Sequence, residues 1–157
     1  RRPLAVRSGQ RLLVHAGLWP HWTADRALDR SRHLEARLRA GDADLLAGAK
    51  TLYRRGGLGR ALFAFTALRL LRPDGSPSRF KGPPGEAPAG DVPWFDAESR
   101  QSRDVEVVCG HWAALGVHRR PGQLQALDSG VAWGGPLSAV RLDDGALVQQ
   151  ASVGGAR

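Results

Sequence analysis

Two short apolar runs each end on a histidine, and this repeated feature limits the folds that the chain can adopt. Residues 11–17 read RLLVHAG, and residues 105–112 read VEVVCGHW. Apolar runs of this length, rich in β-branched residues, are typical of buried strands, and a small residue beside the histidine lets other groups approach it closely. The sequence therefore predicts two buried strands whose loop-facing ends carry His15 and His111.

Between these strands the apolar residues recur with a helical period. A helix is expected between Thr23, whose side chain can cap its start, and Gly41, which can end it. A second helix is expected from Asp42 to Tyr53, and residues 59–71 predict a third whose end can turn into a strand.

The second half of the chain reads mainly as strands and loops. Residues 81–93 are too rich in proline for a helix or a central strand, and the apolar Trp94 that follows favours an anchored loop over a free linker. Another strand is expected near residues 124–127, and residues 137–142 and 146–150 can pair as a hairpin. Helices followed by closely spaced strands indicate an α+β or α/β fold.

Composition sets broad limits on what the protein can be. Its 157 residues fit one domain, and no apolar run is long enough to span a membrane. The single cysteine, Cys109, excludes an internal disulfide and is compatible with a reducing compartment. The formal net charge of +8 points to anionic partners, although arginines scattered along the chain can also reflect compositional bias.

The histidines are the best candidates for chemistry. Neutral imidazole is a common ligand of zinc, manganese, cobalt and iron, so His15 and His111 could bind a metal, and a purely structural role is the alternative. The other three histidines are weaker candidates: His21 is expected at the surface or in a pocket, His33 on a solvated helix face, and His118 on an exposed turn.

No complete catalytic motif is visible. Nucleophile-elbow, phosphate-loop and zinc-cluster patterns are absent from the sequence. Asp128 could be a ligand or a base, but it could also cap the turn that follows it. The five tryptophans are expected mostly to pack at the edge of the core, while some could stack on a nucleobase.

Four stretches of the sequence carry a resemblance to a known family. They are RLLVHAGLWPHWT, GEAPAGDVPWFD, VVCGHWAALG and ALDSGVAWGGPLSAVRLDDG. Together they resemble the C-terminal half of the symmetrical diadenosine tetraphosphatases, bacterial metallophosphoesterases related to the serine/threonine phosphatases. The resemblance runs from about residue 3 to residue 150.

The resemblance implies a fold and a metal site. Residues 1–157 would be the C-terminal part of a single calcineurin-like metallophosphoesterase domain, a four-layer β-sandwich flanked by helices. Two divalent ions, manganese or cobalt before iron or zinc, would bind at its strand ends, with His15 and His111 as ligands of one ion. The family's GDxHG, GDxxxRG and GNHD motifs, which supply the other ligands and the general-acid histidine, do not occur in this chain. Because the chain also lacks methionine, an N-terminal portion is expected to be missing.

The resemblance also suggests phosphate-binding residues. Arg69 matches the last arginine of the family's FTRMR stretch, and Arg60 and Lys81 are further candidates. This sequence departs from the family at Ala67, where the family has arginine, and at Phe63, where it has asparagine. Both departures put substrate affinity or nucleotide preference in question.

The implied function is hydrolysis of diadenosine tetraphosphate to two ADP in the cytoplasm, with a dinucleoside polyphosphate as partner and neither a membrane nor a specific nucleic acid. This chain alone is expected to be inactive because part of the active site lies outside it. Two alternatives stay open: a serine/threonine protein phosphatase of the same fold, and a non-catalytic, basic module that binds nucleotides or RNA.

Overall fold

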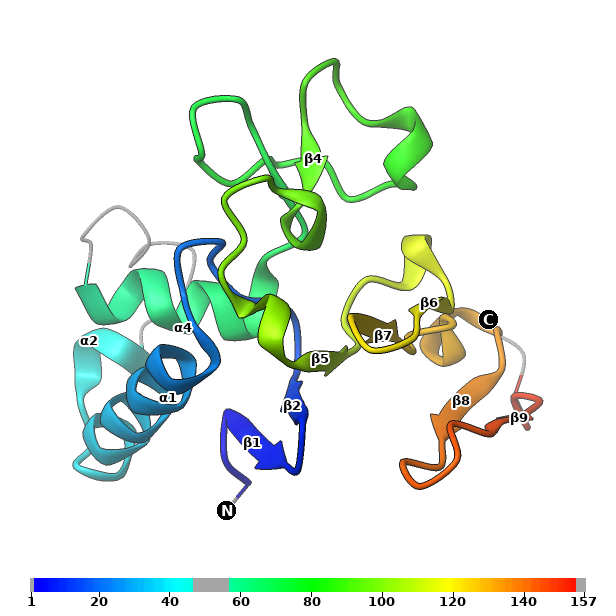
Figure 1. The fold of residues 1–157 in the computed structure, drawn as a ribbon, viewed down its shortest axis with the longest axis horizontal. Coiled ribbons are helices and arrows are strands. Elements are labelled where there is room, and N and C mark those ends of the chain that lie inside the picture. Colours follow the sequence, from blue (N-terminus) through cyan, green and yellow to red (C-terminus); the bar gives the residue numbers. More distant parts are fainter. Residues whose placement is uncertain (1, 47–56, 155–157) are drawn as a thin grey trace.

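A mixed five-stranded sheet forms the centre of the structure (Figure 1). The computed structural model describes residues 2–46 and 57–154. In spatial order, the strands of the sheet are β1 (Ala5–Ser8), β2 (Arg11–Val14), β5 (Glu106–Cys109), β7 (Leu124–Ala126) and β6 (His118–Arg120). Strands β2, β5 and β7 run parallel, and the two edge strands pair antiparallel to their neighbours. The C-terminal ends of β2, β5 and β7 therefore meet at one edge of the sheet.

Three helices gather at one end of the molecule (Figure 1). They are α1 (Ala24–Arg39), α2 (Ala43–Leu46) and α4 (Gly57–Ala67). The predicted cap of the first helix is confirmed, because the Thr23 hydroxyl accepts a hydrogen bond of 3.2 Å from the backbone N–H of Arg26. The second predicted helix begins as α2, and its remainder over residues 47–53 lies outside the described residues. Within the described part of the chain, no helix has the length and apolar character that a membrane crossing requires.

The proline-rich segment is an anchored loop, as predicted. Its two ends are joined because β3 (Leu70–Leu71) pairs antiparallel with β4 (Val92–Pro93). The backbone N–H of Trp94 then donates a 3.0 Å hydrogen bond to the carbonyl of Arg69, and the Trp94 side chain is almost fully buried. The loop is therefore tied to the C-terminal side of α4.

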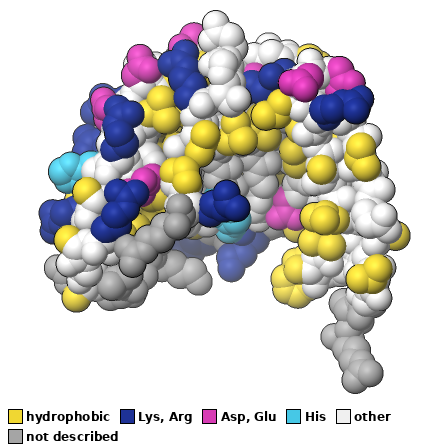
Figure 2. Space-filling model, turned by 90° about the horizontal axis from the view of Figure 1, so that it is seen from below, with side chains coloured by type: hydrophobic (Ala, Val, Ile, Leu, Met, Phe, Trp, Pro, Cys, Tyr) yellow, Lys and Arg dark blue, Asp and Glu magenta, His cyan; other side chains and the backbone are white. Residues whose placement is uncertain are grey.

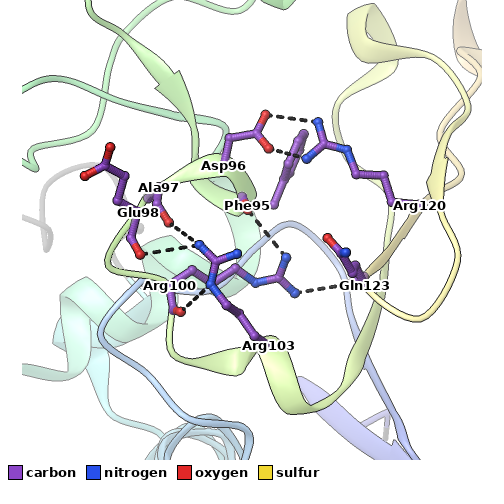
Figure 3. A network of polar contacts seen from close by, with 8 residues as sticks. All are labelled: Phe95, Asp96, Ala97, Glu98, Arg100, Arg103, Arg120 and Gln123. Atoms are coloured by element: carbon purple, nitrogen blue, oxygen red, sulfur yellow. Dashed lines mark hydrogen bonds and ion pairs between the residues drawn. The ribbon is translucent and has the colours of Figure 1, made fainter.

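A buried arginine holds the chain that follows this loop (Figure 3). The guanidinium of Arg100 donates to the carbonyls of Phe95, Ser102 and Gln123 at 3.4, 3.2 and 3.0 Å. It also stacks over the Trp94 ring at 5.5 Å. Burial lowers the pKa of this guanidinium. The arginine thus joins the 95–102 segment to the residue that leads into β7.

The predicted C-terminal hairpin is confirmed and lies at the other end of the molecule from the helices (Figure 1). It consists of β8 (Leu137–Val140) and β9 (Leu147–Gln150), which pair antiparallel as a separate two-stranded sheet. Exposed apolar side chains, among them Leu137 and Val148, gather at this end (Figure 2). Lys and Arg side chains are spread over several parts of the same face of the molecule (Figure 2).

One sequence prediction is wrong. His118 was expected on an exposed turn, but it begins β6, is half-buried and stacks on the Phe95 ring with centroids 5.6 Å apart. The sequence HRR hides this strand because its charged residues do not alternate with apolar ones. Pairing with β7 supplies the backbone hydrogen bonds that fix the strand.

The core supports the predicted fold class. Its largest fully buried side chains are Trp19, Trp94, Phe65 and Leu12. Val107 on β5 is also fully buried, as expected for a central strand in a parallel region. The mixed sheet with its helices confirms an α+β arrangement and is compatible with a metallophosphoesterase-type fold.

Candidate metal and phosphate site

The two predicted histidines lie together where β2 and β5 end. Leu13 of β2 pairs in parallel register with Val108 of β5, so the two chains leave the sheet side by side. The backbone N–H of Gly110 donates a 2.9 Å hydrogen bond to the carbonyl of His15, which extends this pairing past the strand ends. Functional groups often occupy this edge of a parallel sheet, because loops there surround a crevice.

The rings of His15 and His111 are in direct contact. The Nε2 atom of His15 lies 3.1 Å from the Nδ1 atom of His111, and the ring centroids are 4.9 Å apart. Without a ligand, one of these nitrogens can donate a hydrogen bond to the other. Both side chains thus present nitrogen atoms to the same small volume.

His111 is held in an uncommon backbone conformation. Its φ of 69° is the only positive φ of a non-glycine residue in the described part of the chain. The N–H of Trp112 donates to the carbonyl of Gly110 at 2.8 Å, which closes a three-residue turn around His111. Such strain persists only where the surrounding structure fixes it, and it is frequent at functional sites.

The surroundings of His111 favour its neutral form. Burial, with help from the positive charges of Arg69 and His15, lowers the pKa of His111 to about 4. Its Nε2 atom is buried and has no hydrogen-bond partner within the described chain. The imidazole is therefore neutral near pH 7, and its other nitrogen, Nδ1, is the one that faces His15.

This low pKa predicts a pH dependence of stability in the metal-free chain. Between pH 6.5 and about 4, unfolded His111 takes up a proton that the folded form resists, so the free energy of unfolding falls as the pH falls. Glycine tolerates the positive φ and does not titrate, so His111→Gly should weaken this fall by about 1–2 kcal/mol once solvent screening of the half-exposed ring is allowed for. Urea unfolding with a chelator, at pH 7 and pH 4.5, measures the difference. Equal pH slopes for the two proteins would contradict the assignment.

Asp128 follows β7, the third parallel strand, and faces the same edge. Its carboxylate accepts a 3.0 Å hydrogen bond from the N–H of Gly130, so the turn-capping role considered for it is confirmed. Burial lowers the pKa of the Arg69 guanidinium, and the negative charge of the Asp128 carboxylate opposes this effect. Asp128 therefore both shapes the next loop and balances the charge of Arg69.

Arg69 and Lys81 line two cavities, and His111 lines one of them. The cavity on the His111 side has a volume of about 530 Å³ and also includes Trp133 in its lining. The other has a volume of about 710 Å³ and includes Phe63 and further basic residues. The arrangement offers two cations to an anion that lies beside the histidines.

Arg60 occupies a different place. It lies on α4 with its guanidinium 4.9 Å from the centre of the Trp19 ring, and the Trp19 indole N–H donates to its carbonyl at 2.9 Å. It is not among the residues that line either cavity. The structure thus brings Arg69 and Lys81 to the histidines but not Arg60.

The donor set present in this chain fits part of a metal site. Two ligands at right angles on one six-coordinate ion, with bonds of about 2.1 Å, lie roughly 3.0 Å apart, which is close to the separation of the two histidine nitrogens. In the described residues no group of three or more His, Cys, Asp or Glu side chains could hold an ion. His15 and His111 therefore fit as two ligands of an ion that needs further donors.

The sequence did not single out Trp133 as a site residue. It was included among the tryptophans that either pack or stack on a base, yet it is 78% exposed and lines the cavity beside His111. The signal that could have marked it is its setting between Gly130 and Gly134, which is typical of a turn and not of a core strand.

Comparison with known proteins agrees with the resemblance in sequence. No protein-family model matches the chain. A protein named symmetrical bis(5'-nucleosyl)-tetraphosphatase from Burkholderia thailandensis is 46% identical over 91% of this chain and 54% of its own length. Proteins of the same name from Burkholderia mallei and Burkholderia pseudomallei are 45% identical over the same shares.

The chain spans about half the length of these curated relatives. The match covers 91% of this chain. Over most of its length the chain is therefore similar to proteins named symmetrical bis(5'-nucleosyl)-tetraphosphatase.

Proposed function

We propose that this chain is part of an enzyme that hydrolyses diadenosine tetraphosphate to two ADP, and that it contributes two metal ligands and a phosphate-binding surface. The observation that carries the proposal is the contact between His15 and His111 at 3.1 Å, beside a cavity lined by Arg69 and Lys81. The names of the relatives supply the substrate class.

His15 and His111 would hold one of two divalent ions, manganese or cobalt before iron or zinc. Two such ions supply an activated hydroxide and neutralise charge during phosphoanhydride cleavage. The neutral state of His111 near pH 7 and its fixed turn suit a ligand, because a protonated or mobile imidazole would bind a metal poorly. The remaining ligands are proposed to come from outside this chain, which is why we expect the chain alone to show little or no turnover.

Arg69 and Lys81 would bind the phosphates. A guanidinium can hold two phosphate oxygens at once and stays charged even when burial lowers its pKa, as it does here. Lys81 is exposed and supplies a second positive charge at the boundary of the two cavities. Arg60 stays a prediction, and it has the weaker support because it lines neither of the two cavities.

A variant pair tests these roles. We expect Arg69→Gln to lower kcat/KM for diadenosine tetraphosphate about 10- to 100-fold, because a charge-assisted hydrogen bond of about 1.5–3 kcal/mol is lost. Arg60→Gln should change it less than about threefold. The measurement uses a chimera that joins this chain to the part of the B. thailandensis relative that the chain does not match. Equal losses in the two variants would contradict the assignment of Arg69.

Substrate preference and the salt dependence of RNA binding distinguish the two alternative functions from the proposed one. A serine/threonine phosphatase would hydrolyse a phosphopeptide in preference to diadenosine tetraphosphate. A non-catalytic RNA-binding module would bind RNA without metal, with an affinity that falls steeply as salt rises. The proposed enzyme does neither, and its product from diadenosine tetraphosphate is ADP alone. We also propose a cytoplasmic location, which the free, buried thiol of Cys109 supports.

A further inference from the structure

We infer that Trp133 is a stacking platform for a purine base of the substrate, whose phosphates extend from it toward Arg69 and Lys81. This inference rests on the proposed function and adds to it a residue that selects nucleotides over bare polyphosphate. Trp133 is the one exposed Trp, Tyr or Phe side chain within residues 2–46 and 57–154, with 78% of its surface accessible. An indole left in water in this way has its face free for a partner.

The loop that carries Trp133 is rigid. Gly130 and Gly134, at φ values of 77° and 89°, flank a single turn in which the N–H of Trp133 donates to the carbonyl of Gly130 at 2.8 Å. Gly135 donates to the same carbonyl at 3.0 Å, and a side chain at Gly135 would lie only 2.1 Å from the carbonyl oxygen of Ser129. The backbone that carries the indole is therefore fixed before any ligand binds, which lowers the entropy lost on stacking.

The cavity that Trp133 lines has the chemistry of a nucleotide site. Trp133 lines it together with Arg69, Lys81 and His111, and none of the described residues that line it is Asp or Glu. A ring available for stacking, next to two cations and a candidate metal ligand, matches a ligand with an aromatic base at one end and phosphates at the other.

The second cavity explains how a substrate with two nucleosides fits. It adjoins the same two cations, Arg69 and Lys81, and includes Phe63 and Phe80 in its lining. If the middle of the phosphate chain lies at the cations, one nucleoside extends toward Trp133 and the other into this second cavity. Such a placement puts the central phosphoanhydride beside the histidines, as symmetrical cleavage requires.

A protein partner is the competing occupant for the exposed indole. Leu137, Leu147 and Val148 on the β8–β9 hairpin are also exposed, so Trp133 could belong to an apolar docking surface. The nucleotide reading is favoured because Trp133 shares its cavity with the cations and His111, whereas none of these three hairpin residues lines either cavity.

The test compares ATP with inorganic tripolyphosphate as ligands of the 157-residue chain, by isothermal titration calorimetry in the presence of a chelator. Stacking on an aromatic ring contributes about 1–3 kcal/mol per base, so Trp133→Leu should weaken ATP binding roughly 5- to 150-fold. Tripolyphosphate has no base, and its affinity should not change. Trp133→Phe should keep most of the ATP affinity, and Arg69→Gln should weaken both ligands. Unchanged urea unfolding shows that each variant is folded.

Other outcomes overturn the inference. An unchanged ratio of ATP to tripolyphosphate affinity in Trp133→Leu would do so, and so would a loss of self-association with intact ATP binding, which assigns the indole to a protein contact. Failure of the proposed function looks different. In that case the folded chimera yields no ADP from diadenosine tetraphosphate, while the selective loss of ATP binding in Trp133→Leu remains.

Discussion

Replacing His111 with glycine in the chimera is expected to lower the rate of diadenosine tetraphosphate hydrolysis by more than about 100-fold. Loss of an outer-shell group near a metal already lowers affinity or activity by about 10- to 100-fold, and a direct ligand should matter more. Glycine is the informative replacement because it adopts the φ of 69° without strain, so the variant removes the imidazole and leaves the turn intact.

Two further variants separate ligation from general damage. His15→Ala should produce a loss of similar size, since its Nε2 atom lies 3.1 Å from the other imidazole. His33→Ala should leave the rate unchanged, because His33 is exposed on α1. Steady-state rates at saturating manganese, with the manganese retained per chain after desalting, provide the two readouts. Full manganese retention by His111→Gly and His15→Ala would contradict the proposed ligation.

The second large effect is on stability. Replacing Arg100 with alanine should lower the free energy of unfolding by about 3–4 kcal/mol. The carbonyls of Phe95 and Gln123 each lose a donor (Figure 3). The Ser102 carbonyl also loses a donor, and the Trp94 ring loses the guanidinium that covers it. Buried acceptors left without donors are expensive because water cannot replace the lost bonds.

Arg103 supplies the matched control. Its guanidinium also donates to carbonyls, those of Ala97, Glu98 and Arg100, but its side chain is exposed (Figure 3). Arg103→Ala should therefore lower the free energy of unfolding by less than about 1 kcal/mol, since water can take over its bonds. Urea unfolding monitored by circular dichroism measures both variants. Similar losses would show that burial of Arg100 is not what makes its contacts stabilising.

Much of the fold could be predicted because its signals are local. The Thr23 cap and Gly41 frame the first helix, and the apolar runs of β2 and β5 are short and clear. The strand β6 could not be predicted, because its half-buried polar residues are fixed by pairing with β7 and not by their own pattern. The role of Arg100 was hidden for the same reason, since one of its carbonyl partners, Gln123, lies 23 residues away in the sequence.

The sequence predicted which residues form the candidate site better than it predicted their arrangement. Two strands that each end on a histidine suggested that His15 and His111 converge, and the parallel pairing of β2 with β5 brings them together. Apart from the match of Arg69 to the family's FTRMR stretch, nothing in the local sequence showed that Arg69 and not Arg60 would lie near the histidines. That difference arises because the chain turns out of α4 before Arg69, which then lies beside the loop that begins with Lys81.

We propose that this chain supplies two histidine ligands and a phosphate-binding surface to a symmetrical tetraphosphatase. The most direct test incubates diadenosine tetraphosphate and manganese with the folded chimera, with its His111→Gly variant and with the 157-residue chain alone, and identifies the products by chromatography. The account predicts ADP as the sole nucleotide product of the chimera, and almost none from the variant or the chain alone. Equal ADP formation by the chimera and its His111→Gly variant, or AMP and ATP as the products, would contradict it.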